Sequence, residues 1–236
     1  MKILADKIAA ELKDYIFPLF CLGCGQEGLW LCPDCGGKIL RASSGCPVCA
    51  ARNLSGLPCG RCRSALDQIK AIIFYQEDGL SGQAIKLFKY SYAEDIYVVF
   101  EKIIIEYLHL AKDSYKDIDC IVPVPLHPRR YAERGFNQAQ IFAQTVAEIL
   151  DKQLLGDLLL RSRYTAVQAK LTKSQRIKNI KDAFALKRDF SLKSLNILLV
   201  DDVFTTGATM QECARVLKKA GARAVRGLAL SRGNQV

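Results

Sequence analysis

Two adjacent carboxylates follow an apolar run in the segment "ILLVDDVFTTGAT", residues 197–209. Asp201 and Asp202 come after four apolar residues, and a turn of threonines and glycine leads into a helical pattern. An unpaired charge at the end of a buried strand is costly, so a plain exit from the core accounts for one acid better than for two. Amides at a helix start suit a phosphate, and carboxylates accept hydrogen bonds from sugar hydroxyls. The segment therefore predicts a site for a ribose 5-phosphate. No Gly-Lys-Ser/Thr follows, which excludes a nucleoside-triphosphate P-loop.

Eight of the ten cysteines form four C-x2-C pairs within residues 21–62. Disulfide scaffolds seldom use a single spacing, whereas zinc knuckles do. The pattern predicts two structural zinc sites with four thiolates each, and a reducing compartment. Sequential pairing of the knuckles is the simplest arrangement, and interleaved pairing stays open. The expected ligands are Cys21, Cys24, Cys32, Cys35, Cys46, Cys49, Cys59 and Cys62.

Basic side chains are concentrated in the second half of the chain, which has a formal net charge of +10. Residues 1–128 carry 14 basic and 15 acidic side chains, whereas residues 129–236 carry 20 and 9. Two zinc–thiolate sites would bring the total to about +6. Nine basic residues stand against one acid between Arg161 and Arg188. Such a field suits a polyanion, either a phosphorylated metabolite or a nucleic acid.

Alternating strands and helices are expected from residue 67 onward, which predicts an α/β fold with a parallel sheet. Residues 21–64 lack a long apolar period, so metal must hold that segment together. The chain divides accordingly into a cysteine-rich module (1–66) and an α/β domain (67–236). Strands are expected at 69–75, 118–125, 196–200 and 224–230, and helices at 84–89, 96–110, 137–152, after the capping box of Thr172 and Gln175, and after Thr206. Residues 126–136 are expected to form a polar loop.

The first 20 residues carry charges throughout, which excludes the apolar core of a signal peptide. Apolar residues recur there on one helical face, which predicts a short helix packed on the zinc module. No uninterrupted apolar run reaches membrane-spanning length. A cytoplasmic location is expected, with peripheral contact at the inner face of the membrane as the alternative.

Several segments, in this order, resemble the ComF family of competence-associated proteins. The resemblance covers the cysteine knuckles, "VPVPLHPRRYAERGFNQA", "RSRYTAVQAKLTKSQRIKNIKDAF" and the acid-and-threonine segment. The last of these is similar to the signature of type I phosphoribosyltransferases, which bind phosphoribosyl pyrophosphate (PRPP). The resemblance thus implies a type I phosphoribosyltransferase-like sheet behind a double zinc ribbon.

The same resemblance implies roles for individual residues. Asp201 and Asp202 would contact the ribose hydroxyls, with Mg²⁺ held mostly by the pyrophosphate and ribose oxygens and by water. Residues 161–181 correspond to a mobile loop that closes over the site. The 5-phosphate would be held by Thr205, Thr206, Gly207, Ala208 and Thr209, and the pyrophosphate would lie near Arg129, Arg130 and Arg134, with Arg163, Lys170 and Arg176 as candidates on the loop.

Two functions are compatible with these residues. One is a Mg²⁺- and PRPP-dependent phosphoribosyltransferase that acts in the handling of incoming DNA. The other is a non-catalytic accessory protein that keeps PRPP binding, while its zinc module and basic face hold single-stranded DNA or a competence helicase. The acceptor of a transferred phosphoribosyl group is not indicated by any motif.

Overall fold

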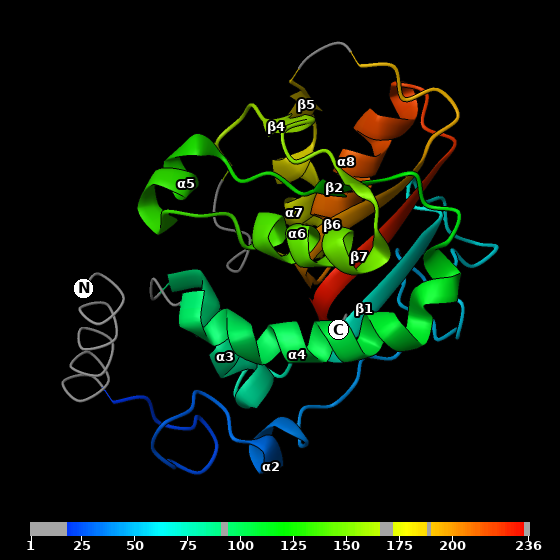
Figure 1. Ribbon diagram of the computed structural model, residues 1–236. Helices are drawn as coiled ribbons and strands as arrows, with labels where there is room; N and C mark the ends of the chain where they lie inside the picture. Colours follow the sequence, from blue (N-terminus) through cyan, green and yellow to red (C-terminus); the bar gives the residue numbers. More distant parts are fainter. Residues whose placement is uncertain (1–17, 91–93, 166–171, 188–189, 234–236) are drawn as a thin grey trace, which may run out of the picture.

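Five parallel strands form the central sheet of the computed structural model, which describes residues 18–90, 94–165, 172–187 and 190–233. The strand order is β1-β7-β6-β2-β3 (Figure 1). Such an order requires crossover connections, which the helices between the strands provide. The strands are β1 (Gln68–Phe74), β2 (Cys120–Pro123), β3 (Gln153–Leu154), β6 (Asn196–Phe204) and β7 (Ala224–Arg232).

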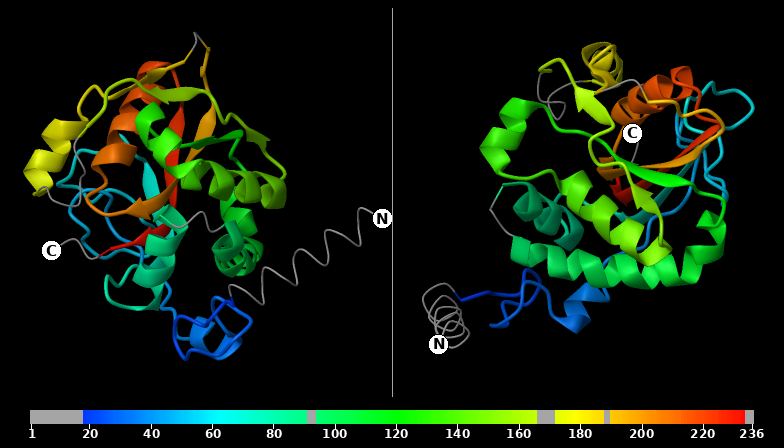
Figure 2. Two further views of the ribbon diagram at one scale, coloured as in Figure 1. Left: turned by 90° about the vertical axis from the view of Figure 1, so that its left-hand side faces the viewer. Right: turned by 45° about the horizontal axis from the view of Figure 1, so that its top comes forward.

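Helices cover both faces of the sheet, as Figures 1 and 2 show. One face packs against α3 (Leu80–Tyr90), α4 (Glu94–Ala111) and α6 (Gln138–Leu150). The other packs against α8 (Ala208–Lys219), α7 (Lys173–Ile180) and an antiparallel hairpin of β4 (Leu159–Arg161) and β5 (Phe184–Leu186). The shorter helices are α2 (Pro33–Gly36), η1 (Lys112–Tyr115) and α5 (Pro128–Arg134).

The strand β6 shows why its sequence is almost continuously apolar. Ile197 and Leu199 are buried in the cluster that includes α8, whereas Leu198 and Val200 are buried against α4 and α6. A strand buried on both faces needs apolar residues at every position. The polar residues Asp201 and Asp202 follow where this double cover ends. The predicted α/β fold with a parallel sheet is thus confirmed.

The helix α5 contradicts the expectation of a polar loop over residues 126–136. His127 caps its first turn by accepting a hydrogen bond from the Arg129 amide, and Pro128 stands at the first helical position. Gly135 ends the helix with φ +81°. These are ordinary helix signals. The sequence nevertheless predicts a loop here, because α5 has no buried residue and therefore no apolar period that would mark a helix.

The cysteine-rich segment lies against β1 and extends the hydrogen bonding at that edge of the sheet. The Ala42 amide donates to the Ile72 carbonyl (3.1 Å), and the Phe74 amide donates to the Leu40 carbonyl (2.8 Å). The division at residues 66 and 67 stays a prediction. The expected helix near the N-terminus lies outside the described residues. Among the described helices, none has the length and apolar character needed to cross a membrane.

Candidate functional site

The two acids lie side by side at the carboxyl end of β6. The Asp202 amide donates to the Asp201 carboxylate (2.9 Å). Lys89, on α3, forms a salt bridge with Asp202, with 3.0 Å between Nζ and Oδ2 and only 23% and 16% of the two side chains exposed. Lys89 was not predicted, because nothing in the sequence of α3 indicates that this residue meets β6.

Their surroundings shift the pKa values of the two carboxyl groups in opposite directions. Burial, followed by the neighbouring Asp202, raises the pKa of Asp201 well above its usual range. Burial also acts against ionisation of Asp202, but the charge of Lys89 and its hydrogen bond outweigh it and hold the pKa of Asp202 below its usual range. The pair thus carries one firmly ionised carboxylate beside one that is easily protonated.

The turn after the acids surrounds a small hollow that is open to solvent. Gly207 has φ +76° and no side chain with which to cap α8, which begins at Ala208. The Ala208 amide donates to the Thr206 hydroxyl (3.5 Å), and the positive end of the α8 dipole at this turn favours an anion. The residues lining the hollow are Asp201, Val203, Phe204, Thr205, Thr206, Gly207, Ala208, Thr209 and Met210.

The helix α7 brings one of the expected basic residues to this turn. Its predicted capping box is present, since Thr172 and Gln175 bond reciprocally. Arg176 donates from Nη1 to the Thr205 hydroxyl (3.2 Å). Arg163 instead donates to the carbonyls of Asn179 (3.0 Å) and Lys181 (2.6 Å), where it fixes the end of α7. Lys170 lies outside the described residues.

The remaining predicted arginines lie on α5. Arg129 stacks over the Tyr164 ring at 5.2 Å, and His127 contacts the same ring edge-on, with 5.0 Å between ring centroids. Tyr164 follows β4, so these contacts join α5 to the hairpin. Arg134 donates from Nη1 to the Gln138 side chain (3.2 Å), at the start of α6.

Arg161 is a buried basic residue that the sequence analysis did not single out. It is 7% exposed and donates to the Thr165 hydroxyl. Burial, then the charge of Arg130, lowers its pKa. Among the described residues, Nε of Arg161 and Nη2 of Arg130 are buried donors without a hydrogen-bond acceptor. A buried guanidinium group beside a half-buried one, each with an unused donor, suits an anion. The density of basic residues after position 160 was the only sequence signal for Arg161.

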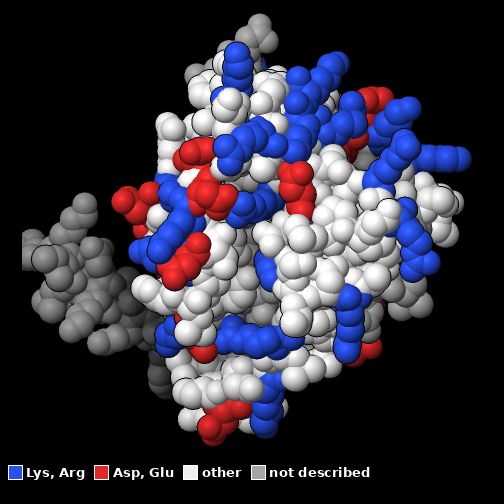
Figure 3. All heavy atoms as spheres, turned by 90° about the vertical axis from the view of Figure 1, so that its right-hand side faces the viewer, with Lys and Arg blue, Asp and Glu red and all other residues white. Residues whose placement is uncertain are grey.

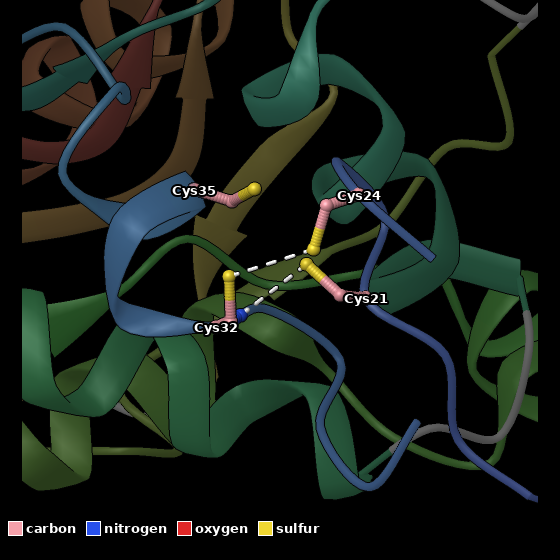
Figure 4. A group of neighbouring side chains, drawn as sticks. All are labelled: Cys21, Cys24, Cys32 and Cys35. Atoms are coloured by element: carbon pink, nitrogen blue, oxygen red, sulfur yellow. Dashed lines mark hydrogen bonds between the residues drawn. The ribbon is translucent and has the colours of Figure 1, made fainter. Parts of the chain in front are cut away.

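The eight paired cysteines form two clusters in sequential order. The sulfur atoms within each cluster lie within 4.8 Å of one another. The Cys24 and Cys32 sulfurs are 3.7 Å apart, and those of Cys49 and Cys59 are 3.6 Å apart. A tetrahedral zinc with bonds of about 2.3 Å separates its sulfur ligands by about 3.8 Å. Figure 4 shows the side chains of the first cluster pointing toward one another. Both clusters could therefore hold zinc.

Basic side chains also occur away from this turn. Figure 3 shows Lys and Arg over the upper part and along one edge of the face at the right of Figure 1, with acidic groups among them. Several described basic residues form salt bridges, such as Arg226 with Asp117 and Lys218 with Asp67. Basic side chains are therefore found on this face as well as near the turn, and some of them are neutralised by acidic partners.

Known proteins share both the carboxyl-terminal half and most of the whole chain. Residues 137–235 match the family model described as "Phosphoribosyl transferase domain". The "DNA utilization protein YhgH" of Escherichia coli strain K12 is 32% identical over 203 residues, which cover 84% of this chain and 88% of that protein. "Competence protein ComFC" of Streptococcus pneumoniae is 31% identical over 209 residues, covering 86% and 87%. The chain belongs to the ComF family.

Two further known proteins match parts of this chain. "Competence protein F" of Haemophilus influenzae is 36% identical over 117 residues, which cover 48% of this chain and 50% of that protein. Among solved structures, a purine phosphoribosyltransferase from Pyrococcus horikoshii is similar with a TM-score of 0.39 and 22% identity over 56% of this chain and 73% of that one. The ComF-family assignment rests on the sequence relatives, and the family model identifies a domain of the phosphoribosyltransferase type.

Proposed function

We propose that this ComF-family protein binds PRPP together with Mg²⁺ at the carboxyl end of β6, and that it transfers the phosphoribosyl group with release of pyrophosphate. The observation that carries the proposal is the hollow lined by residues 201 and 203–210, which joins the carboxyl group of Asp201 to the first turn of α8. Carboxyl ends of parallel strands are where ligands bind in such sheets.

The 5-phosphate of PRPP needs hydrogen-bond donors, and its ribose hydroxyls need acceptors. The site offers both. The amides and hydroxyls of Thr205–Thr209 hold the 5-phosphate, with Arg176 reaching the same turn through Thr205. Asp201 and Asp202 accept hydrogen bonds from the ribose hydroxyls. Because Lys89 already occupies Asp202, ribose binding exchanges a salt bridge for hydrogen bonds. Mg²⁺ would supply positive charge against the pyrophosphate and would be held mostly by the pyrophosphate and ribose oxygens and by water.

The arginines of α5 and the hairpin act on the leaving group. In the reaction, the bond between the anomeric carbon and the pyrophosphate oxygen breaks, and the pyrophosphate leaves with the electron pair. A nucleophilic atom of the acceptor bonds to that carbon and loses its proton. Arg130 and Arg161 offer unused buried donors for the departing charge, and Arg129 and Arg134 lie on the same helix as Arg130.

The cysteine clusters have a structural role in this proposal. Each offers four protein ligands and so leaves no open position for a substrate. Reduced cysteines of this kind persist in a reducing compartment, which supports a cytoplasmic location. Contact with the inner face of the membrane is the alternative.

Calorimetric titration with PRPP tests the proposal. We expect the zinc-loaded protein to bind PRPP only with Mg²⁺, and the double variant Asp201→Asn/Asp202→Asn to bind roughly 100-fold more weakly, because it loses two charge-assisted hydrogen-bond acceptors. The variant Asp113→Asn/Asp157→Asn makes the same change of charge at exposed positions and should bind as the wild type does. Absence of PRPP binding by the wild type would refute the proposal.

The second candidate is a non-catalytic accessory protein that binds PRPP while it holds single-stranded DNA or a competence helicase. The spread of basic side chains in Figure 3 favours it, and so do the words "DNA utilization" and "competence" in the names of the relatives. Binding of an oligonucleotide through its phosphates weakens steeply with salt, with a slope set by the number of contacts. Steep salt dependence without pyrophosphate release in the presence of DNA and PRPP supports this candidate, and binding that is independent of salt contradicts it.

A further inference from the structure

The second cysteine cluster (Cys46, Cys49, Cys59 and Cys62) lies directly behind the turn that forms the hollow. Arg232, at the end of β7, donates from Nη1 to the Gly45 carbonyl (3.2 Å) and from Nη2 to the Cys46 carbonyl (3.1 Å). Arg232 is only 6% exposed. The backbone of the first knuckle of this cluster is therefore attached to the sheet by one buried guanidinium group.

The same guanidinium group contacts the turn through Phe204. Its Cζ atom lies 5.3 Å from the centre of the Phe204 ring, which is fully buried. Phe204 in turn packs against Gly207. A Cβ atom at Gly207 would lie 2.6 Å from Cζ of Phe204 and 2.9 Å from the Pro47 carbonyl oxygen. Gly207 is thus enclosed between the ring that Arg232 covers and the knuckle that Arg232 holds.

A buried arginine needs compensation for its lost hydration. Within the described residues, Arg232 forms no salt bridge with a carboxylate; its hydrogen bonds go to the two carbonyls of the knuckle. A zinc ion with four thiolates carries two net negative charges. A zinc-loaded second cluster therefore supplies the charge that a buried Arg232 lacks.

Within the part of the chain that the structure describes, the first cluster has no such connection to the turn. Its buried cysteines, Cys21, Cys32 and Cys35, pack with Leu31 and with Leu80 at the start of α3. This difference makes the first cluster a natural control for the second.

We propose that Arg232 is a positioning residue, and that the zinc-loaded second cluster fixes the conformation of residues 204–208 through Arg232, Phe204 and Pro47. The consequence for binding rests on the proposed function, in which this turn holds the 5-phosphate of PRPP. The effect on the conformation of the turn does not depend on the proposed function, because it is measured on the protein without ligand.

Two pairs of variants test the proposal. Cys49→Ser removes the exposed ligand of the second cluster, and Cys24→Ser removes the exposed ligand of the first. Arg232→Met breaks the link, and Arg226→Met changes an arginine on the same strand that instead pairs with Asp117. For each variant, amide hydrogen exchange is measured over residues 204–211 and over α6 without ligand, and PRPP affinity is measured by calorimetry with Mg²⁺.

In Cys49→Ser and Arg232→Met, we expect amide exchange over residues 204–211 to accelerate at least about ten-fold while exchange over α6 stays unchanged. We also expect these two variants to bind PRPP about ten-fold more weakly, which is the loss expected for hydrogen bonds of a charged group. The two control variants should match the wild type in both measurements. Unchanged exchange in Cys49→Ser and Arg232→Met overturns the proposal, and so does equal acceleration over α6, which indicates general destabilisation. If the wild type binds no PRPP, the proposed function fails, and the exchange data alone still decide whether the cluster fixes the turn.

Discussion

Asp201 and Asp202 are neighbours in the chain, yet their surroundings act on the two carboxyl groups in opposite directions. Replacing Asp201 by Asn should therefore raise the free energy of unfolding near pH 7 by about 1 kcal/mol, because it removes a carboxyl group whose ionised form is disfavoured by burial and by Asp202, while the Asn oxygen still accepts from the Asp202 amide. Replacing Asp202 by Asn should lower it by a similar amount, because Lys89 then loses its partner. Urea unfolding of both variants measures these changes.

The pH dependence of the two effects has opposite sign as well. The folded-state pKa of Asp201 lies above its unfolded value, so the penalty that Asn relieves is absent in acid and grows as the pH rises above about 4. The folded-state pKa of Asp202 lies below its unfolded value, so its stabilisation is present above about pH 4 and is lost as the pH falls through the folded pKa. Lys89→Met should abolish the difference between Asp202 and its Asn variant. Equal destabilisation by both Asn substitutions would contradict this account.

At this scale the sequence predicts what is local and misses what is distant. The acids and the threonine turn could be predicted because they are consecutive in the sequence, at the end of one strand and the start of one helix, and their residue types alone indicate a ribose 5-phosphate site. Lys89 and Arg161 could not, because their partners depend on how α3 and the hairpin pack around β6.

Among the elements, the glycine that ends α5 and the glycine that precedes α8 offer a matched pair. Gly135 and Gly207 have φ values of +81° and +76°. A Cβ at Gly135 meets nothing within 4 Å, whereas at Gly207 it collides with Phe204 and Pro47. Gly135→Ala should therefore cost about 1 kcal/mol of stability from backbone strain alone and leave PRPP binding unchanged. Gly207→Ala should cost more and abolish PRPP binding, because the turn must move.

Unfolding in urea and calorimetry with PRPP distinguish the two substitutions. If Gly207→Ala keeps wild-type affinity for PRPP, the turn does not hold the 5-phosphate in the observed conformation. Both positions have nearly the same φ value, so the strain of an added Cβ is similar at each. The difference in stability between the two variants therefore reports the collision with Phe204 and Pro47 at Gly207.

The helix α7 gives a second prediction at the element scale. Thr172→Ala removes the cap at its start and should destabilise the helix by about 1 kcal/mol. Because Arg176 reaches Thr205 from this helix, PRPP affinity should fall a few-fold, whereas Thr172→Ser should retain both properties. Circular dichroism in urea and calorimetry measure the two effects; an unchanged affinity would show that α7 does not need to be formed for binding.

Elements were predictable where a period or a cap marks them. The strands β1, β6 and β7 and the helix α8 have long buried faces, and α7 has its capping box. The strands β4 and β5 were missed because a long segment separates them, so no turn residues join them into a recognisable hairpin. Residues 161–181, which the family resemblance equates with a mobile loop, contain the helix that the capping box predicted.

At the scale of the whole molecule, the cysteine-rich segment is joined to the edge of the sheet through backbone groups as well as through side chains such as Arg232. The Ile69 amide donates to the Gly56 carbonyl (2.9 Å), and residues 40–42 pair with the other end of β1. Backbone pairing leaves little trace in side-chain pattern. The two clusters were therefore predictable from cysteine spacing, whereas their attachment to β1 was not.

This attachment predicts that the loss of metal destabilises more than the segment that binds it. We expect two equivalents of zinc per chain, one for each cluster. Their removal by a chelator should lower the melting temperature by about 5 °C or more, because the segment unfolds and leaves the edge of β1 unpaired. An exposed edge strand also promotes association, so the metal-free protein should aggregate at concentrations at which the zinc-loaded protein does not. Metal analysis, calorimetric melting and light scattering measure these changes, and restoring zinc should reverse them. A metal-free protein with unchanged melting and scattering would mean that the α/β domain does not depend on the cysteine-rich segment for its edge.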